Sequence, residues 1–241
     1  MSDTSNELVY QVKEYGGVSD KVVFLFCPFG VPSWQMALPG LPIRRLTHRG
    51  YKVFAYSYGL PIITITPAIT IENMRAILDD ADKRINRLGS NQTIYCFGTS
   101  MGTVLAANFA SHHTRVSKLV LNLCYVNIAD HILHLPFMWL ITPRKVKQYV
   151  AAGGGTHGLH KIFDPYSPDH LLDRLKGRDI LLYTSRNDRI LQYKDTKDLR
   201  KSMNKANIHV SYSVSRWLGH YLTALANHLR AKKYLQFLAG L

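Results

Sequence analysis

The stretch Thr93–Ala110, TIYCFGTSMGTVLAANFA, decides the fold of this 241-residue chain. It begins with β-branched and aromatic residues, passes through two glycines and ends in an alanine-rich apolar segment. The first part predicts a buried strand and the last part a helix, so Ser100 falls at the turn between them. Gly98 and Gly102 flank this serine in the pattern G-x-S-x-G.

A serine at such a turn is either a turn former or a nucleophile. In a sharp strand-to-helix turn the serine backbone is strained, and its Oγ projects from the sheet. The two glycines remove side chains that would collide with the neighbouring strand and helix. The helix that follows directs N–H groups and its positive dipole end towards a developing oxyanion. The spacing therefore favours Ser100 as a nucleophile.

A nucleophilic serine needs a base, and the base needs an acid that orients it. Asp188 lies in the polar turn after the strand-like run 179–185, DILLYTS. His220 comes after the strand-like run 208–214, IHVSYSV, at the start of a helix. Because the carboxyl ends of parallel strands meet at one edge of a sheet, we expect these side chains to approach Ser100 there. We predict His220 as the base and Asp188 as the acid.

Other residues compete for these roles. Asp130 follows the run LVLNLCYV and is the alternative acid, whereas His209 begins a strand and therefore lies at the wrong edge. The remaining histidines include two H-x-x-H pairs, His131 with His134 and His157 with His160. With no third ligand nearby, these pairs do not predict a metal site.

Short apolar runs alternate with helical ones along the chain, which predicts an α/β fold with a mostly parallel sheet covered on both faces. One expected helix has Thr70 as its N-cap and Gly89 as its C′ residue, and the last helix spans 221–238. The segment 127–178 contains no obvious strand. We interpret it as a helical cap inserted in a core formed by 1–126 and 179–241.

The loop after the first buried strand carries the last element of the pattern. The run Val23–Trp34, VFLFCPFGVPSW, is similar to the HGFGxxxW-type loop of the α/β-hydrolase superfamily, with Cys27-Pro28 in place of His-Gly. With the elbow, the acid and the histidine in the order Ser, Asp, His, the chain from Leu8 to Leu241 resembles a compact serine esterase or lipase of that superfamily. The resemblance implies an α/β-hydrolase fold, an oxyanion hole made by the N–H groups of Phe29 and Met101, and a short N-terminal part that lacks the first of the usual eight strands.

The same resemblance implies hydrolysis of carboxylic esters through an acyl-enzyme, without a cofactor. Lactonases and thioesterases share this triad, and a ligand-binding protein without turnover on the same fold stays an alternative. In the expected cap, the apolar run 131–143, HILHLPFMWLITP, predicts that Phe137 and Trp139 line a substrate pocket over Ser100. The alternative for this run is contact with a membrane, assisted by Arg144, Lys145 and Lys147.

The composition limits the kinds of binding partner and the cellular location that we expect. The net charge of +14 is spread in small clusters without a nucleic-acid motif, so we expect a small-molecule ester or lactone as partner, no nucleic acid, and at most weak contact with an anionic membrane surface. The chain has neither a signal-peptide pattern nor an apolar run of about 18 residues. Its three cysteines fit no metal or redox spacing, and we expect reduced thiols in a cytoplasmic protein.

Overall fold

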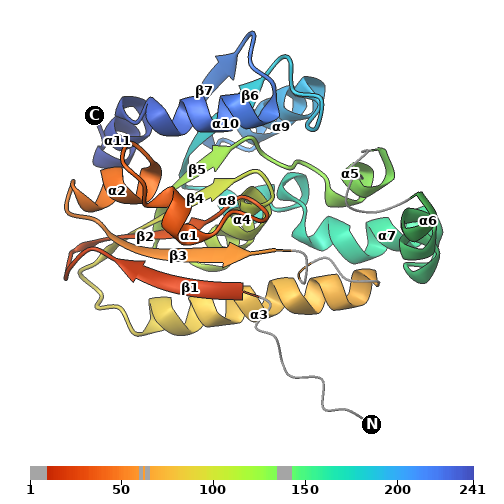
Figure 1. Cartoon of the computed structure of the whole chain (residues 1–241), viewed down its shortest axis with the longest axis horizontal. Helices are drawn as coiled ribbons and strands as arrows, with labels where there is room; N and C mark the ends of the chain where they lie inside the picture. The colour runs from red at the N-terminus through yellow and green to blue at the C-terminus, as the bar shows by residue number, and fades with distance from the viewer. Residues whose placement is uncertain (1–9, 60–61, 63–65, 135–142) are drawn as a thin grey trace.

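The structure is a computed structural model that describes residues 10–59, 62, 66–134 and 143–241. These residues form a seven-stranded sheet in the order β1-β3-β2-β4-β5-β6-β7 (Figure 1). β1 runs antiparallel to β3, and every other neighbouring pair is parallel, which confirms the predicted mostly parallel sheet. The strands are β1 Tyr10–Tyr15, β2 Lys21–Phe26, β3 Lys52–Tyr58, β4 Thr93–Thr99, β5 Val116–Asn122, β6 Asp179–Ser185 and β7 His209–Ser215.

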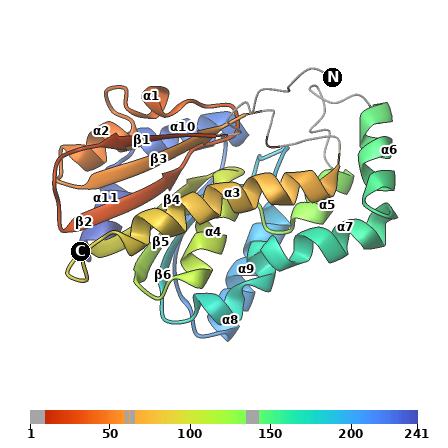
Figure 2. The same cartoon turned by 90° about the horizontal axis from the view of Figure 1, so that it is seen from below.

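Helices cover both faces of this sheet. One face carries α1 (Ser33–Met36), α2 (Pro42–Thr47), α10 (His220–Leu229) and α11 (Lys232–Ala239) (Figures 1 and 2). The other carries α3 (Pro67–Asn86), α4 (Gly102–His112), α8 (Leu172–Leu175) and α9 (Tyr193–Lys205). Each face buries alternate side chains of the same strands, as the two-residue period of a strand requires.

The two cores hold the strands from opposite sides. Phe24 of β2 packs on Phe109 of α4, with 4.6 Å between their ring centroids. On the other face Phe97 of β4 packs on Tyr234 of α11, with centroids 5.3 Å apart. Because all four rings are buried, the neighbouring strands β2 and β4 are packed against helices on opposite faces of the sheet.

Two expected helix boundaries are wrong. α3 begins one turn earlier than predicted, because Thr66 is its N-cap and accepts a hydrogen bond from the N–H of Ile69. Thr70 is instead buried within the helix, where its hydroxyl accepts a hydrogen bond from Tyr149. The helix ends at Asn86, so Gly89 lies beyond its C′ position.

The expected last helix, 221–238, is two helices. α10 ends at Leu229 and α11 begins at Lys232, with Arg230 leaving the helical conformation between them. Because of this break, α11 has its own axis, and its residues Tyr234 and Leu238 are buried in the core.

Between β5 and β6 the described residues are helical. They form α5 (Ile128–His134), α6 (Pro143–Ala152), α7 (Gly155–Phe163), two short 3-10 helices (Asp164–Tyr166 and Pro168–His170) and α8. α5, α6 and α7 lie beyond the edge at which the parallel strands end (Figure 1). Within the described ranges, every helix is too short or too polar to cross a lipid bilayer.

Candidate active site

Ser100 occupies a strained turn between β4 and α4. Its φ of 53° lies in the left-handed region, which a residue with a side chain rarely adopts. A Cβ on Gly98 would lie 2.4 Å from the carbonyl oxygen of Gly102, and a Cβ on Gly102 would lie 2.2 Å from that of Phe26. Both distances are far below van der Waals contact, so the turn tolerates only glycine at these two positions.

Ser100, His220 and Asp188 form one hydrogen-bonded chain. The Oγ of Ser100 lies 3.0 Å from Nε2 of His220, and Nδ1 of His220 lies 2.7 Å from Oδ2 of Asp188. The histidine is the first residue of α10, and the aspartate follows β6. The side chains of His220 and Asp188 are 6% and 1% exposed, so water barely weakens their contact.

The second oxygen of Asp188 is also held. Its Oδ1 accepts hydrogen bonds from the backbone N–H groups of Ile190 and Leu191, at 2.8 and 2.9 Å. These bonds fix the plane of the carboxylate so that Oδ2 points at His220. The loop therefore aims the carboxylate before any ligand binds.

The rival residues lie elsewhere. The carboxylate of Asp130 is half exposed on α5 and lies 3.5 Å from Nε2 of His160. His209 opens β7 at the amino end of the sheet, where it pairs with Asp179 at 3.1 Å. Each of these side chains therefore has a partner other than Asp188 or His220.

The loop after β2 is pinned to β3. The N–H of Cys27 donates to the carbonyl of Tyr56, and the N–H of Gly30 donates to that of Tyr58. The buried hydroxyl of Tyr58 donates to the carbonyl of Cys27 at 2.6 Å. Phe29 lies inside this anchored loop and Met101 caps α4 directly after Ser100, so the Cys27-Pro28 departure leaves a well-fixed loop.

Tyr125 is a site residue that the sequence analysis missed. Its buried side chain makes a hydrogen bond with Ser100, and burial raises the pKa of its hydroxyl, although that hydrogen bond acts in the opposite direction. The side chain of Tyr125 therefore touches the nucleophile directly, on a different strand end from Asp188. Tyr125 follows β5 just as Asp188 follows β6. This position after a parallel strand is the feature of the sequence from which Tyr125 could have been predicted as a site residue.

His131 packs beside Tyr125, with ring centroids 4.6 Å apart. Its Nδ1 donates to the carbonyl of Asn127, and its buried Nε2 has no hydrogen-bond partner in the described part of the chain. Burial lowers the pKa of His131 to about 4, so the ring is neutral at pH 7. The uncharged imidazole ring of His131 therefore packs next to the Ser100–Tyr125 pair.

A second buried histidine lies behind the elbow. Nε2 of His228 on α10 is 3.4 Å from both the hydroxyl of Thr99 and the amide nitrogen of Asn122. Burial lowers the pKa of His228 to about 3, so the ring is neutral at pH 7. The Asn122 amide nitrogen can only donate, so Nε2 is the acceptor of that hydrogen bond. This cluster ties the helix that carries His220 to the strand that carries Ser100.

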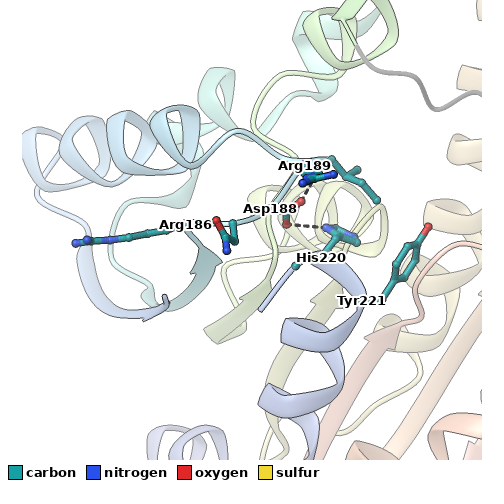
Figure 3. A pocket seen from close by; sticks show the side chains of 8 residues that line it. Arg186, Asp188, Arg189, His220 and Tyr221 are labelled. Atoms are coloured by element: carbon teal, nitrogen blue, oxygen red, sulfur yellow. Dashed lines mark hydrogen bonds and ion pairs between the residues drawn. The ribbon is translucent and has the colours of Figure 1, made fainter. Parts of the chain in front are cut away.

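A cavity of about 510 Å³ opens beside His220 (Figure 3). Its lining includes Asp188, the exposed guanidinium-bearing Arg186 and Arg189, and Tyr221. Phe137 and Trp139, the predicted pocket residues, lie outside the described residues. Of the basic residues near them, Arg144 and Lys147 are exposed on α6.

The other reactive side chains do not form a metal cluster in the described ranges. His160 instead lies 3.1 Å from Asp164 on the next turn of its own helix. Cys27, Cys96 and Cys124 are buried and unpaired, as predicted, and burial raises the pKa of the Cys124 thiol to about 12.

Comparison with known proteins gives structural matches only. No protein-family model matches the chain, and no curated protein matches it by sequence. The chain is similar to Thermogutta terrifontis esterase 2 phosphonylated by sarin, with a TM-score of 0.64, 14% identity, and coverage of 98% of this chain and 92% of that one. A thermostable carboxyl esterase from Bacillus coagulans gives a TM-score of 0.63 at 13% identity, covering 95% and 92%. A lipase in its open form gives 0.64 at 14% identity, covering 95% and 94%.

These likenesses extend over nearly the whole chain, with the sheet as their common core. They show that the chain has the α/β-hydrolase fold seen in these esterases and this lipase. The fold alone does not decide the chemistry, which rests on the residues of the site.

Proposed function

We propose that this chain, which has the α/β-hydrolase fold, is a serine hydrolase that cleaves carboxylic esters through an acyl-enzyme. Ser100 Oγ attacks the acyl carbonyl while His220 takes its proton. The alkoxide leaves with a proton from His220, and water then attacks the acyl-Ser100 ester by the same route. Asp188 keeps the imidazole oriented and stabilises its charged form.

The observation that carries this proposal is the continuous contact from Ser100 Oγ through His220 to Asp188, at 3.0 and 2.7 Å. The left-handed backbone at Ser100 supports it, because such strain in a buried turn is retained where it serves a site. Esterases among the structural matches make an ester the first substrate class to test.

Three further groups complete the proposed mechanism. The N–H groups of Phe29 and Met101 hold the oxyanion, and the Tyr125 hydroxyl donates to Oγ and lowers the energy of the attacking alkoxide. The helices of 127–178 form a cap over the strand ends, and Phe137 and Trp139 of this cap contact the acyl chain. No cofactor takes part in these steps.

The test is covalent labelling followed by turnover. A fluorophosphonate probe should add once, and peptide mapping should place the adduct on Ser100. The purified protein should also hydrolyse short p-nitrophenyl esters for many turnovers. Ser100→Ala should lower kcat by about 10³-fold or more, because the members of such a triad act as a unit.

Ser111→Ala is the matched control, since Ser111 is a buried serine on α4. Its hydroxyl donates to the carbonyl of Asn108 one turn earlier and lies near Nδ1 of the adjacent His112. This variant should keep both labelling and turnover. A label on another residue, or an active Ser100→Ala variant, contradicts the mechanism. Labelling with a single release of p-nitrophenol and no turnover instead favours a ligand-binding protein. A parallel panel of lactones and thioesters ranks these substrates against esters.

A further inference from the structure

Helix α10 has its polar side inside and its apolar side outside. Its buried residues are His220, Thr223 and His228. The opposite side exposes the residues Tyr221, Leu222, Leu225 and Leu229, at 68%, 61%, 45% and 50%. Spacings of three and four residues place them on one side of the helix. A surface helix ordinarily shows polar residues to water, and this side has no partner among the residues that the structure describes.

Helix α1 extends this surface. Trp34 and Leu38 are 54% and 46% exposed. Leu229 lies against the loop that follows α1, since a Cβ on Gly40 would be 3.2 Å from its Cδ2. Both views place α1 and α10 beside each other on the same face of the sheet (Figures 1 and 2). We call the exposed apolar residues of α1, of the loop directly after it and of α10 the apolar face: Trp34, Leu38, Tyr221, Leu222, Leu225 and Leu229.

The charge around the apolar face has one sign. The segments 21–71 and 199–241 contain no Asp or Glu, but they contain five and seven Lys or Arg residues respectively. These segments supply α1, α2, α10 and α11, which cover this side of the sheet. Exposed cations flank the apolar residues, namely Arg44, Arg45, Arg216, Arg230, Lys232 and Lys233.

The opposite face of the sheet differs. Its long helix α3 carries four of the chain's sixteen acidic residues, Glu72, Asp79, Asp80 and Asp82. The net charge of +14 is therefore distributed unevenly over the molecule, and the helices that carry the apolar face contain no Asp or Glu. Such a surface attracts an anionic partner and repels another copy of itself.

We propose that the apolar face docks on an anionic lipid bilayer. The leucines and Trp34 enter the boundary between headgroups and acyl chains, and the surrounding Arg and Lys side chains contact the acidic headgroups. A second copy of the chain fits this surface less well, because it would bring together two sets of helices that carry Lys and Arg but no Asp or Glu.

The docking surface reaches the candidate active site. Tyr221 belongs to the apolar face and also lines the cavity beside His220 (Figure 3). When the protein is bound to a bilayer through the apolar face, the opening of this cavity therefore lies close to the bilayer surface. The docking itself does not depend on the proposed ester hydrolysis, and its test uses binding as the readout.

The experiment is co-sedimentation with vesicles of phosphatidylcholine, with and without phosphatidylglycerol. The protein should bind the vesicles that contain phosphatidylglycerol, and about 0.5 M NaCl should weaken this binding by screening. The double variant Leu222→Glu/Leu225→Glu should bind at least about tenfold more weakly, because each leucine loses its apolar burial and meets like charge. Hydrolysis of soluble p-nitrophenyl acetate, if present in the wild type, should be retained.

Ile69→Glu is the matched control, since Ile69 is 43% exposed on α3 at the opposite face. It should bind vesicles like the wild type. Binding that the double variant retains, or that the control loses equally, overturns the proposal. So does the absence of binding to phosphatidylglycerol vesicles at low salt. Sedimentation that shows a dimer, separated by the double variant, assigns the apolar face to a second copy instead.

Discussion

The Nδ1 atom of His220 lies 2.7 Å from Oδ2 of Asp188, although 32 residues separate them in the chain. The contact joins the loop after β6 to the first residue of α10. Asp130, which also follows a strand, points to His160 instead. Replacing aspartate with asparagine should therefore affect kcat very differently at these two positions.

Asp188→Asn should lower kcat by about 10⁴-fold, because the amide favours the wrong imidazole tautomer and no longer stabilises the imidazolium. Asp130→Asn should leave kcat within about threefold of the wild type. Steady-state kinetics with one p-nitrophenyl ester compares the two variants. A larger loss in Asp130→Asn makes Asp130 the acid.

Tyr125→Phe should lower kcat by about tenfold with little change in KM, because it removes one hydrogen bond from the nucleophile. Its control is Tyr149→Phe, which removes a buried hydroxyl that bonds to Thr70 on the cap side. Both variants should lose similar thermal stability, but only the first should lose rate. Equal rates in the two variants would remove Tyr125 from the mechanism.

Gly102→Ala should destabilise the fold by about 1–3 kcal/mol or more, because its Cβ would meet the carbonyl oxygen of Phe26 at 2.2 Å. Gly17→Ala provides the comparison, since its Cβ would find no atom within 4 Å. That variant should stay within about 0.5 kcal/mol of the wild type. Urea unfolding of both proteins measures the difference. A Gly102→Ala variant as stable as the wild type would show that the turn at Ser100 can shift to accommodate the methyl group.

The stability should fall as the pH is lowered below neutrality. The native pKa of His228 is lowered to about 3, whereas in an unfolded chain a histidine titrates near ~6.5. Between these values the unfolded chain binds one more proton, so acid favours unfolding. For His228 alone the free energy of unfolding should drop by about 2 kcal/mol from pH 7 to pH 5.

His228→Gln should reduce the total drop by about 2 kcal/mol, while the similar share of the buried His131 remains, and urea titrations at pH 7, 6 and 5 would measure it. His209→Gln serves as the reference, because the side chain of His209 is 74% exposed. The slope of the reference should match that of the wild type. An unchanged slope in His228→Gln would mean that other groups cause the acid sensitivity.

The amino-acid sequence by itself determined the sheet, the elbow and the candidates for the three residues of the hydrogen-bonded chain. Each rests on a local pattern, namely an apolar run that ends in a polar turn, or glycines at fixed distances from Ser100. Parallel strands bring their carboxyl ends to one edge, so residues far apart in the chain could be assigned to one site. Helix boundaries followed less well from the sequence, since the N-cap predicted at Thr70 lies one turn earlier, at Thr66.

Only the tertiary structure decided between groups that share the same local pattern. Asp130 and Asp188 both follow strands, but Asp188 contacts His220 whereas Asp130 lies beside His160. Tyr125 gained its contact with Ser100 only when β5 was placed beside β4. In α10 the spacing of the leucines predicts an amphipathic helix without saying which side is buried. The hydrogen bonds of His228 with Thr99 and Asn122 turn the polar side inwards, and the leucines therefore face outwards.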